Sequence, residues 1–474
     1  MPFAANRLLS RVGLCFGALL ATLPLPACDS SASVTTGEAG SGATGGSQGG
    51  SGGSTGGSTG QGGAECTPPT PTAQPINVPA GNMTWVDFPD AFCANGKPTG
   101  IGVSPAPEGS NRLFIYLIGG GACWNKETCY DNPIAANITS GVGQAEFNAY
   151  NINDWWYFNR GAADNPFAKD HLVVVPYCTG DVHAGTQVTD HGGIATSHVG
   201  ALNMAAYLKR LQATFPSVTH VVLAGGSAGG IGASFNWHRV IDAFPCARVD
   251  MIDDAAALLP PPYLQENLEQ AWRTAWGLNA GLPADCAACL TDLNAIYPYS
   301  AAKSPNGRGA VMHGTLDSVV AFYFNLTQPQ VAESLKALAE GTLNPIPNFR
   351  HYYVAGDHHG VFSPAFSQNG VPVPIWINQM LSGDPVWANV EPGDCADAGV
   401  CSECQSCALS GPCAAQVATC QAEPECLALF ECGDTCAGDA ACIQACIDQH
   451  PEGVDEATAV LQCVNEEVCF GLCQ

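Results

Sequence analysis

The sequence predicts an α/β fold with a doubly wound, mostly parallel sheet, followed by a small disulfide-rich, helical C-terminal module. Two observations predict the sheet. Apolar runs of strand length alternate with helical stretches, and each run ends in glycine or turn residues. A third observation predicts the module, because 14 of the 24 cysteines lie between Cys395 and Cys473.

Five apolar runs have the length and the β-branched content of buried parallel strands. They are LFIYLIGG (113–120), HLVVVPYC (171–178), THVVLAGG (219–226), RGAVMHG (308–314) and RHYYVAG (350–356). Between them, HVGALNMAAYLKRLQATF (198–215) has apolar residues at roughly helical spacing. Because strands and helices alternate, we expect one sheet with helices on both faces, in a domain of residues 66–390.

The N-terminus predicts export. Two arginines precede the apolar run VGLCFGALLATLPLPA, which is too short for a stable membrane span, so residues 1–28 are expected to be a signal peptide. The junction LPAC (25–28) resembles a bacterial lipoprotein cleavage box, in which Cys28 becomes the lipidated N-terminus. We expect a lipoprotein anchored at the cell surface or outer membrane. Ordinary cleavage near Ala27, with free secretion, is the alternative.

Residues 29–64 consist almost entirely of Gly, Ser, Thr, Ala and Gln. Such a composition cannot repay the entropy of ordering, so we expect a flexible tether with a root-mean-square span of roughly 30–35 Å. The pattern Gly-x-Ser-x-Gly occurs four times in this tether. None of these four serines follows a strand or opens a helix, so we expect no chemistry from them.

The charge of the chain excludes some partners. Its 16 basic and 42 acidic residues give a formal net charge of −26. This balance argues against nucleic acid and against basic patches that adhere to anionic lipid, so a lipid anchor is the only membrane contact we expect. Residues 391–474, the predicted module, hold 15 Asp or Glu and no Lys or Arg.

The cysteines predict disulfides in two separate regions. Without Cys15, in the signal peptide, and Cys28, eight remain between Cys66 and Cys289 and fourteen in the module. Both numbers are even, so each region can close its own disulfides, as exported chains do.

The module predicts a stapled helical hairpin. Three cysteine pairs are spaced C-x-x-x-C: Cys432/Cys436, Cys442/Cys446 and Cys469/Cys473. This spacing places two thiols on one helix face, so residues 425–450 are expected to form two short helices joined by cross-bridges. A metal site is the alternative for Cys401, Cys404 and Cys407, but an exported chain favours disulfides.

A fifth Gly-x-Ser-x-Gly pattern, GGSAGG (225–230), has the context of a nucleophile elbow. Ser227 follows an apolar strand and opens the helix GGIGASFNWHRVIDAF. An elbow is a tight strand-to-helix turn, in which side chains two residues before and after the serine would collide with backbone. Gly225 and Gly229 satisfy this requirement, and the helix N-terminus directs free N–H groups toward an anion beside the serine.

A nucleophilic serine needs a base, and the base needs an orienting acid. In α/β-hydrolases the chain order is serine, acid, histidine. The next predicted strand that ends in an acid supplies Asp317, and the strand after it supplies His358 and His359. We expect His359 to be the base because it stands at Gly-x-x-His spacing from Gly356, with His358 as the alternate.

An oxyanion needs hydrogen-bond donors near the serine. GGGACWN (119–125) follows the strand 113–118, which is where lipases place their glycine-rich oxyanion loop. We expect the N–H of Gly121 or Ala122 to be one donor and that of Ala228 to be the second. Such a donor is typically worth about 10²–10³ in turnover.

These segments resemble the pectinacetylesterase/Notum family over roughly residues 80–390. GGGACWN is similar to its Gly-Gly-Trp-Cys loop, PYCTGDVHAG (176–185) to its Tyr-Cys-x-Gly-Asp segment, and GGSAGG to its nucleophile motif. Asp254 in IDDAAALLP is similar to its Asp-Ser-Gly segment, and Asp317-Ser318 to its acid. The resemblance implies an α/β-hydrolase-like serine carboxylesterase that works outside the cell without metal or cofactor. It also implies Trp124 and Asp254 as substrate-pocket residues.

The functional hypothesis is therefore hydrolysis of an acyl ester on a polysaccharide such as pectin, through an acyl-enzyme on Ser227, and we expect the acyl group to be acetyl. One alternative is removal of longer acyl chains, as in the Notum branch of the family. Another is a catalytically inactive surface-display or adhesion protein. Ser227, Asp317 and His359 stand in the order that an active hydrolase needs, which argues against the inactive alternative.

Overall fold

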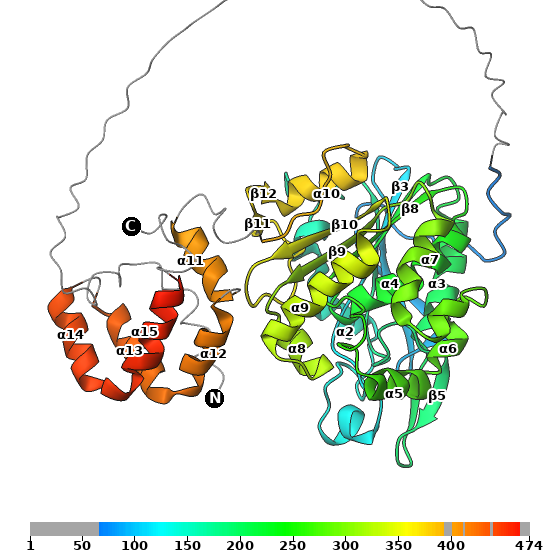
Figure 1. Ribbon diagram of the computed structural model, residues 1–474. Coiled ribbons are helices and arrows are strands. Elements are labelled where there is room, and N and C mark those ends of the chain that lie inside the picture. The colour runs from blue at the N-terminus through cyan, green and yellow to red at the C-terminus, as the bar shows by residue number, and fades with distance from the viewer. Residues whose placement is uncertain (1–65, 393–400, 411–412, 437–438, 465–474) are drawn as a thin grey trace, which may run out of the picture.

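An eight-stranded mixed sheet forms the centre of the larger part of the protein (Figure 1). The computed structural model describes residues 66–392, 401–410, 413–436 and 439–464. The strand order is β1-β2-β4-β3-β7-β8-β9-β10. The strands are β1 (Thr84–Phe92), β2 (Pro98–Ser104), β3 (Arg112–Leu117), β4 (His171–Val175), β7 (His220–Gly226), β8 (Arg248–Asp254), β9 (Gly309–Gly314) and β10 (Phe349–Val354).

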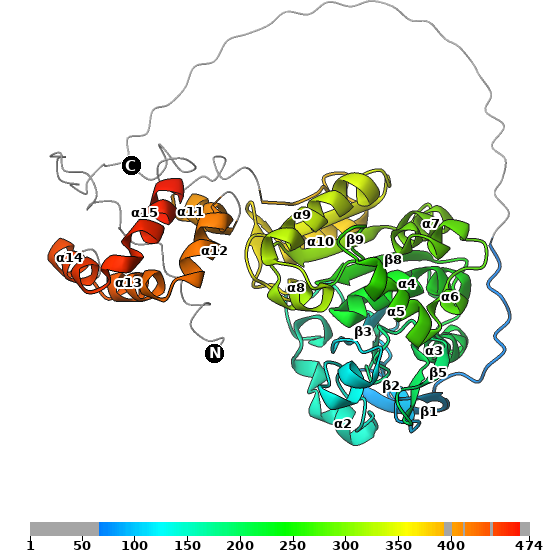
Figure 2. The same cartoon turned by 60° about the horizontal axis from the view of Figure 1, so that its bottom comes forward.

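Six of these strands, β4 to β10 in the sheet order, run parallel, whereas β1 and β2 are antiparallel additions at one edge. α2 (Gln144–Ala149) lies against β1, as Figure 2 shows. Because the central strands are parallel, their carboxyl ends share one edge of the sheet. Leu117 at the end of β3 pairs with Gly225 near the end of β7, beside the elbow. This edge carries the candidate site.

Helices cover both faces of the sheet, so the predicted doubly wound α/β fold is confirmed. Leu113, Ile115 and Leu117 of β3 face one apolar core, whereas the alternate residues Phe114 and Tyr116 face another. Helices on the first face include α3 (Gly200–Thr214), α4 (Ala228–Ala243), α5 (Glu266–Trp276), α7 (Ile296–Lys303), α8 (Ser318–Phe324) and α9 (Gln328–Leu338). The second face is covered by α10 (Val373–Ser382) and the irregular aromatic segment 152–167.

The five predicted strands correspond to β3, β4, β7, β9 and β10, and the predicted helix 198–215 to α3. β8 is not among the predicted strands, and its sequence RVDMIDD holds three acids. These acids are paired inside the fold. Asp250, fully buried, accepts hydrogen bonds from Arg248 at 2.6 Å and His220 at 2.8 Å. A buried strand can therefore carry charged residues when the fold supplies their partners.

The eight cysteines between Cys66 and Cys289 pair only with one another, as their even number predicts. The disulfides are Cys66–Cys246, Cys93–Cys178, Cys123–Cys129 and Cys286–Cys289. Disulfides of this kind belong to an oxidising compartment, which supports export.

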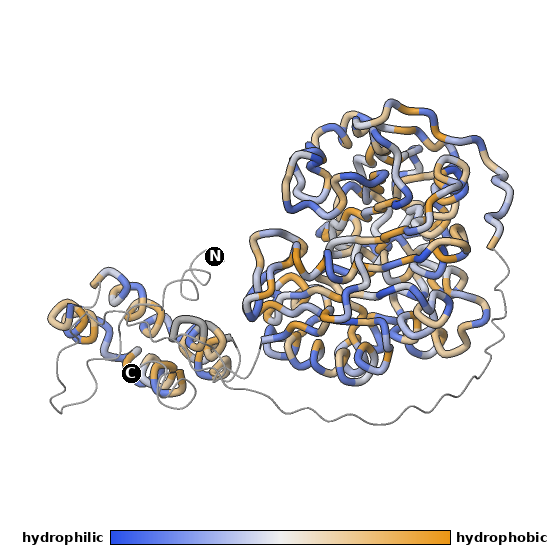
Figure 3. Tube along the Cα trace, turned by 90° about the horizontal axis from the view of Figure 1, so that it is seen from above, coloured by the Kyte–Doolittle hydropathy of each residue, from blue (hydrophilic) through white to orange (hydrophobic). Residues whose placement is uncertain are grey.

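The C-terminal region is helical, with an apolar core made from its own residues between Cys404 and Val464. Its helices are α11 (Cys401–Ser410), α12 (Ala414–Ala422), α13 (Pro424–Asp434), α14 (Ala440–Gln449) and α15 (Val454–Gln462). Hydrophilic and hydrophobic residues alternate along these short helices (Figure 3), as expected for helices that bury one face.

The predicted stapled hairpin is present. Cys432 near the end of α13 is bonded to Cys446 in the second half of α14, and Cys436, just after α13, is bonded to Cys442 near the start of α14. Cys413–Cys463 and Cys420–Cys426 add further links. Cys404 and Cys407 are also disulfide-bonded, so the metal alternative is wrong for these two cysteines.

Several predictions lie outside the described residues. These are the signal peptide 1–28, the lipidation of Cys28, the tether 29–64 and the pair Cys469/Cys473. The domain boundaries, 66–390 and 391–474, stay a prediction. Within the described ranges, no helix combines the length and the apolar character that a membrane crossing requires.

Candidate active site

Ser227 occupies a strained turn between β7 and α4. Its φ of 55° and ψ of −127° lie in a region that side chains rarely adopt. Its N–H donates a 2.7 Å hydrogen bond to the Asp254 carbonyl oxygen, which fixes the turn against β8. A Cβ atom at Gly225 would overlap the Gly229 carbonyl, and one at Gly229 would overlap the Leu117 carbonyl. The structure therefore confirms why both positions are glycine.

Three side chains from distant segments form one hydrogen-bonded chain at this turn. His359 Nδ1 lies 2.8 Å from Asp317 Oδ2, and His359 Nε2 lies 2.9 Å from Ser227 Oγ. A carboxylate only accepts, so Nδ1 carries the proton and Nε2 is free to accept the serine hydroxyl. This arrangement has the geometry of a serine hydrolase triad.

The structure distinguishes the two neighbouring histidines. His359 points its ring at Ser227, whereas His358 packs its ring on Phe366, with centroids 5.1 Å apart. His358 N–H donates to the Gly356 carbonyl at 3.2 Å, which turns the loop tightly before His359. Of the two, only His359 contacts both the serine and the acid.

Asp317 is fully buried and sits at the N-cap of α8. One carboxylate oxygen, Oδ1, accepts the N–H groups of Val319 at 2.9 Å and Val320 at 3.0 Å. The other oxygen contacts His359. These contacts hold the carboxylate in a fixed orientation toward the His359 ring, as an orienting acid requires.

The loop that holds the predicted oxyanion donors lies against the serine. Gly121, Ala122 and Ala228 line the same cavity as Ser227 and His359. Gly121 has a φ of +73°, and a Cβ there would overlap the Ile134 carbonyl, so the tight course of this loop requires glycine.

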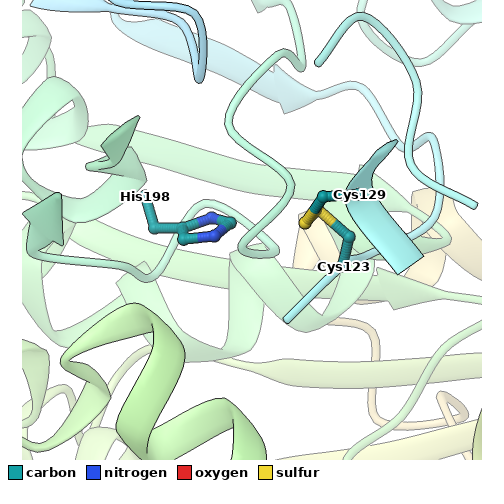
Figure 4. Close-up of side chains that lie close together, drawn as sticks. All are labelled: Cys123, Cys129 and His198. Atoms are coloured by element: carbon teal, nitrogen blue, oxygen red, sulfur yellow. A yellow bond between two sulfur atoms is a disulfide. The ribbon is translucent and has the colours of Figure 1, made fainter. Parts of the chain in front are cut away.

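Cys123 anchors the loop immediately after these donors. Its N–H donates to the Gly180 carbonyl and its carbonyl accepts from Trp276 Nε1, both at 2.8 Å. The disulfide Cys123–Cys129 closes the loop on itself, and His198 lies beside it (Figure 4). These two hydrogen bonds and the disulfide fix the position of the loop that carries the predicted donors.

The sulfur atoms of Cys123 and Cys129 lie close enough to His198 to suggest a metal site, but both are oxidised in the disulfide. Metal ligation by cysteine needs thiolates. His198 Nδ1 lies 2.8 Å from the Thr179 carbonyl, and its Nε2 lies 3.0 Å from His191. Burial lowers the pKa of His198 to about 4, so the ring is neutral and structural.

The cavity beside Ser227 is small, about 30 Å³, and almost entirely apolar. We call it the acyl cavity. Its apolar walls come from Val182, Ile231, Ala256, Trp272, Val319, Val320, Tyr323 and Phe324. These wall residues are not among the residues predicted from the sequence. The aromatic run FYF (322–324), which follows Asp317, is the one sequence feature that could have indicated an aromatic wall near the site.

A larger groove of about 360 Å³ adjoins the acyl cavity, and Tyr323 and Phe324 line both. Trp124, expected in the substrate pocket, lines this groove and not the acyl cavity. The groove lies between the oxyanion loop, α5 and α8.

Asp254, the other expected pocket residue, lines neither space; it is buried beneath the histidine loop. Its Oδ1 accepts the N–H groups of Val361 at 2.8 Å and Phe362 at 3.2 Å. Burial raises the pKa of Asp254 to about 6, although these two hydrogen bonds act in the opposite direction. The residue therefore positions the loop, and nothing places it against a substrate.

Comparison with known proteins gives a family match over residues 77–313, half of the chain, to pectinacetylesterase. The matched segment contains Ser227 and the oxyanion loop. It ends before Asp317 and His359.

Similar proteins carry the names of deacylating enzymes. Palmitoleoyl-protein carboxylesterase notum2 of Xenopus laevis is 31% identical over 163 residues, which are 31% of this chain and 30% of that protein. Palmitoleoyl-protein carboxylesterase NOTUM of Homo sapiens is 28% identical over 187 residues, 35% of this chain and 34% of that protein. The chain thus matches about a third of the length of these relatives.

Two further similar proteins are a relative that is named as inactive and a protein of solved structure. An inactive palmitoleoyl-protein carboxylesterase, notum1b of Danio rerio, is 32% identical over 126 residues, 23% of this chain and 76% of that protein. The solved structure of the Wnt deacylase Notum from Drosophila has a TM-score of 0.49 and 14% identity, and covers 65% of this chain and 96% of that chain.

Proposed function

The chain belongs to the pectinacetylesterase family, and from this premise we propose that it is a serine carboxylesterase that removes acetyl groups from a polysaccharide such as pectin. The observation that carries the proposal is the hydrogen-bonded chain Ser227–His359–Asp317. Nothing in it requires a cofactor, because its three side chains together supply a nucleophile, a base and an orienting acid.

The geometry supports a two-step mechanism. His359 Nε2 takes the Ser227 hydroxyl proton while Oγ attacks the ester carbonyl. The carbonyl oxygen becomes an oxyanion within reach of the N–H groups of Ala122 or Gly121 and of Ala228. His359 then gives its proton to the leaving sugar oxygen, which departs as an alcohol and leaves an acyl-enzyme. Water, deprotonated by His359, attacks the acyl-enzyme, and acetate leaves as Ser227 regains its proton.

The size of the acyl cavity favours a short acyl group. One water molecule needs roughly 10–15 Å³ of such space. A cavity of about 30 Å³ therefore admits two or three heavy atoms, which matches the acetyl group. A sixteen-carbon chain, of the kind in the printed names of the relatives, would need a far larger space than this.

The proposal predicts that Ser227→Ala abolishes hydrolysis of p-nitrophenyl acetate while leaving the melting temperature nearly unchanged. His359→Ala should lose activity as well, whereas His358→Ala should keep it. Steady-state kinetics of purified protein, with fluorophosphonate labelling read by intact mass, measures both effects. Undiminished turnover by pure Ser227→Ala would remove the serine from the mechanism.

Two alternative functions give different results in these assays. A deacylase for longer chains would hydrolyse octanoate or palmitate esters faster than acetate. An inactive surface-display protein, for which the inactive fish relative is a precedent, would leave the fluorophosphonate probe unreacted. Labelling of wild type but not of Ser227→Ala supports the esterase.

We further propose that the enzyme works outside the cytoplasm, as a lipoprotein anchored through Cys28 or as a secreted protein. The disulfides of the described residues support export. Cys28→Ala should move an anchored protein from the membrane fraction to the soluble extracellular fraction. A protein that is soluble in both forms is secreted.

A further inference from the structure

The groove beside the acyl cavity has the size and the chemistry of a second, separate binding site. Its volume of about 360 Å³ falls within the roughly 300–1,000 Å³ that is typical of ligand sites. It adjoins the acyl cavity through Tyr323 and Phe324. An ester whose acyl group lies in the acyl cavity could therefore extend its alcohol part into this groove.

The groove combines aromatic faces with amide groups. Trp124, Tyr323 and the 64% exposed Phe322 supply the aromatic surface. Gln265 and Asn267 at the start of α5 supply amide donors and acceptors. A pyranose ring presents C–H groups on its faces and hydroxyls at its rim, so aromatic surfaces and amides together match it. A fatty acyl chain has no groups that could form hydrogen bonds with these amides.

None of the residues that line the groove is charged. The charges next to it are negative or already paired. Glu266 is exposed in the first turn of α5, and Glu269 pairs with Arg273 at 2.6 Å. Lys126, two residues after Trp124, pairs with Asp131. An anionic sugar would therefore meet no free cation among these groups, and the net charge of −26 would repel it.

We propose that this groove, which we call the sugar groove, binds uncharged pyranose units of the acetylated carbohydrate and disfavours free uronate units. The inference rests on the proposed esterase function and narrows its substrate from polysaccharide in general to neutral or charge-masked chains. Pectin would fit this site where its carboxylates are methyl-esterified.

Tyr323 separates the sugar groove from the acyl cavity. Its ring lines both spaces, and its hydroxyl donates to the Ile134 carbonyl, beside the oxyanion loop. The hydroxyl is thereby held, and the ring cannot swing aside without losing this hydrogen bond. Tyr323 therefore acts as a wall that sets acyl length, and its removal should join the two spaces.

The first test compares two substrates of equal length and acetyl content, acetylated xylo-oligosaccharide and acetylated oligogalacturonate with free carboxylates. We expect kcat/KM to be at least about tenfold higher for the neutral substrate at low ionic strength, with a gap that narrows as salt screens the repulsion. Equal values, or a preference for the anion, would overturn the proposal.

The second test uses variants. Phe322→Ala should lower kcat/KM for the neutral oligosaccharide about fivefold to tenfold relative to p-nitrophenyl acetate in the same protein. Ile375→Ala, which changes a 52% exposed apolar residue on α10, is the matched control and should leave this ratio unchanged. If Phe322→Ala instead lowers hydrolysis of octanoate esters alone, the groove holds acyl chains and the proposal is wrong.

Two readouts separate this inference from the proposed function. Xylohexaose should bind Ser227→Ala more tightly than hexagalacturonate does, by calorimetry, whether or not the wild-type protein hydrolyses esters. Tyr323→Ala should raise the ratio of octanoate to acetate hydrolysis at least about tenfold. An unchanged ratio would contradict the role of Tyr323 as the wall, and tighter binding of the galacturonate would contradict the neutral groove.

Discussion

The Asp254 carboxylate holds the backbone N–H of Val361, 107 positions later in the chain, through a 2.8 Å hydrogen bond. The Asp254 carbonyl also accepts the N–H of Ser227. One residue at the end of β8 therefore fixes both the nucleophile turn and the loop of the proposed base. The distance between Ser227 Oγ and His359 Nε2 therefore depends in part on this shared support.

Replacement of this support should misplace the base without emptying the substrate site. We expect Asp254→Ala to lower kcat for p-nitrophenyl acetate by up to about 10²-fold, with little change in KM, because a small displacement of a reacting group is costly. Asp254→Asn should recover much of the activity, since its amide oxygen can accept both N–H groups. Stopped-flow and steady-state kinetics check this, and wild-type kcat in Asp254→Ala would contradict it.

The same residue should shape the pH profile. As the pH falls through about 6, Asp254 takes up a proton and becomes a weaker acceptor for the histidine loop. The acid limb of kcat against pH should therefore be steeper in wild type than in Asp254→Asn, whose side chain at position 254 takes up no proton. Identical limbs would mean that the charge of Asp254 does not act on the loop.

The tight packing of the elbow makes a prediction for stability. Gly229→Ala places a methyl group against the Leu117 carbonyl and should lower the free energy of unfolding by about 3 kcal/mol. Gly341→Ala is the matched control, since its Cβ meets nothing within 4 Å and it lies in a helical turn. The control should be neutral or stabilising by about 0.5–1 kcal/mol. Chemical denaturation with intact disulfides measures both, and equal effects would contradict the packing argument.

The disulfide beside the oxyanion loop should matter more for catalysis than its short span suggests. Removing Cys123–Cys129 as a double Cys→Ala variant should cost about 2 kcal/mol of stability and also lower kcat, because Cys123 follows Gly121 and Ala122, which are the proposed oxyanion donors. Cys286–Cys289 closes a similarly short loop whose cysteines do not line the acyl cavity. The corresponding double variant should lose a similar amount of stability but keep kcat. A kcat loss of the same size in both variants would show that the first disulfide acts only on stability.

Asp253 predicts how stability depends on pH. Burial raises its pKa from 3.8 to about 7, the neighbouring Asp254 acts in the same direction, and hydrogen bonds from Ser234 and Tyr297 oppose it. Between these two pH values the native state holds a proton that the unfolded chain has released. The free energy of unfolding should therefore fall as the pH rises from about 4 to about 7, by at most about 1.4 kcal/mol per pH unit for this group.

Asp253→Asn tests this assignment. The variant cannot titrate at position 253, so its stability should fall less over the same pH range, and at pH 8 it should gain stability relative to wild type. Denaturant titrations at pH 5 and pH 8 provide the measurement. A wild type whose stability rises over this range, or a variant with the wild-type slope, would contradict the assignment.

Much of the sheet and the turn around Ser227 could be predicted because they depend on sequence patterns within a few residues. The strand before Ser227, the helix after it and its two flanking glycines are all visible within a few residues. The order of serine, acid and histidine could also be predicted. However, the premise that β9 is the next strand with an acid at its end was wrong, because β8 ends at Asp254.

The remainder depends on contacts between distant segments. Which of His358 and His359 faces Ser227 depends on the conformation of a loop that Asp254 holds through hydrogen bonds. The residues next to the two histidines do not reveal that conformation. The hydrogen-bond partners of Asp250 in β8 include His220 of another strand. Trp124 could be assigned to a substrate pocket from its motif. That it lines the sugar groove, however, follows only from the packing of α5 and α8.

The helix α8 has seven residues, Ser318–Phe324, and Asp317 is its N-cap. Two turns of backbone thus join the acid of the proposed triad to Tyr323 and Phe324, which line both the acyl cavity and the sugar groove. An insertion, a deletion or a tilt of α8 that made room for a bulkier ester would also move the Asp317 carboxylate away from the His359 imidazole. A change in acyl preference therefore requires side-chain substitutions on α8 that leave its backbone in place. Tyr323 and Phe324 are the positions where such substitutions, natural or engineered, can alter the acyl cavity without displacing Asp317.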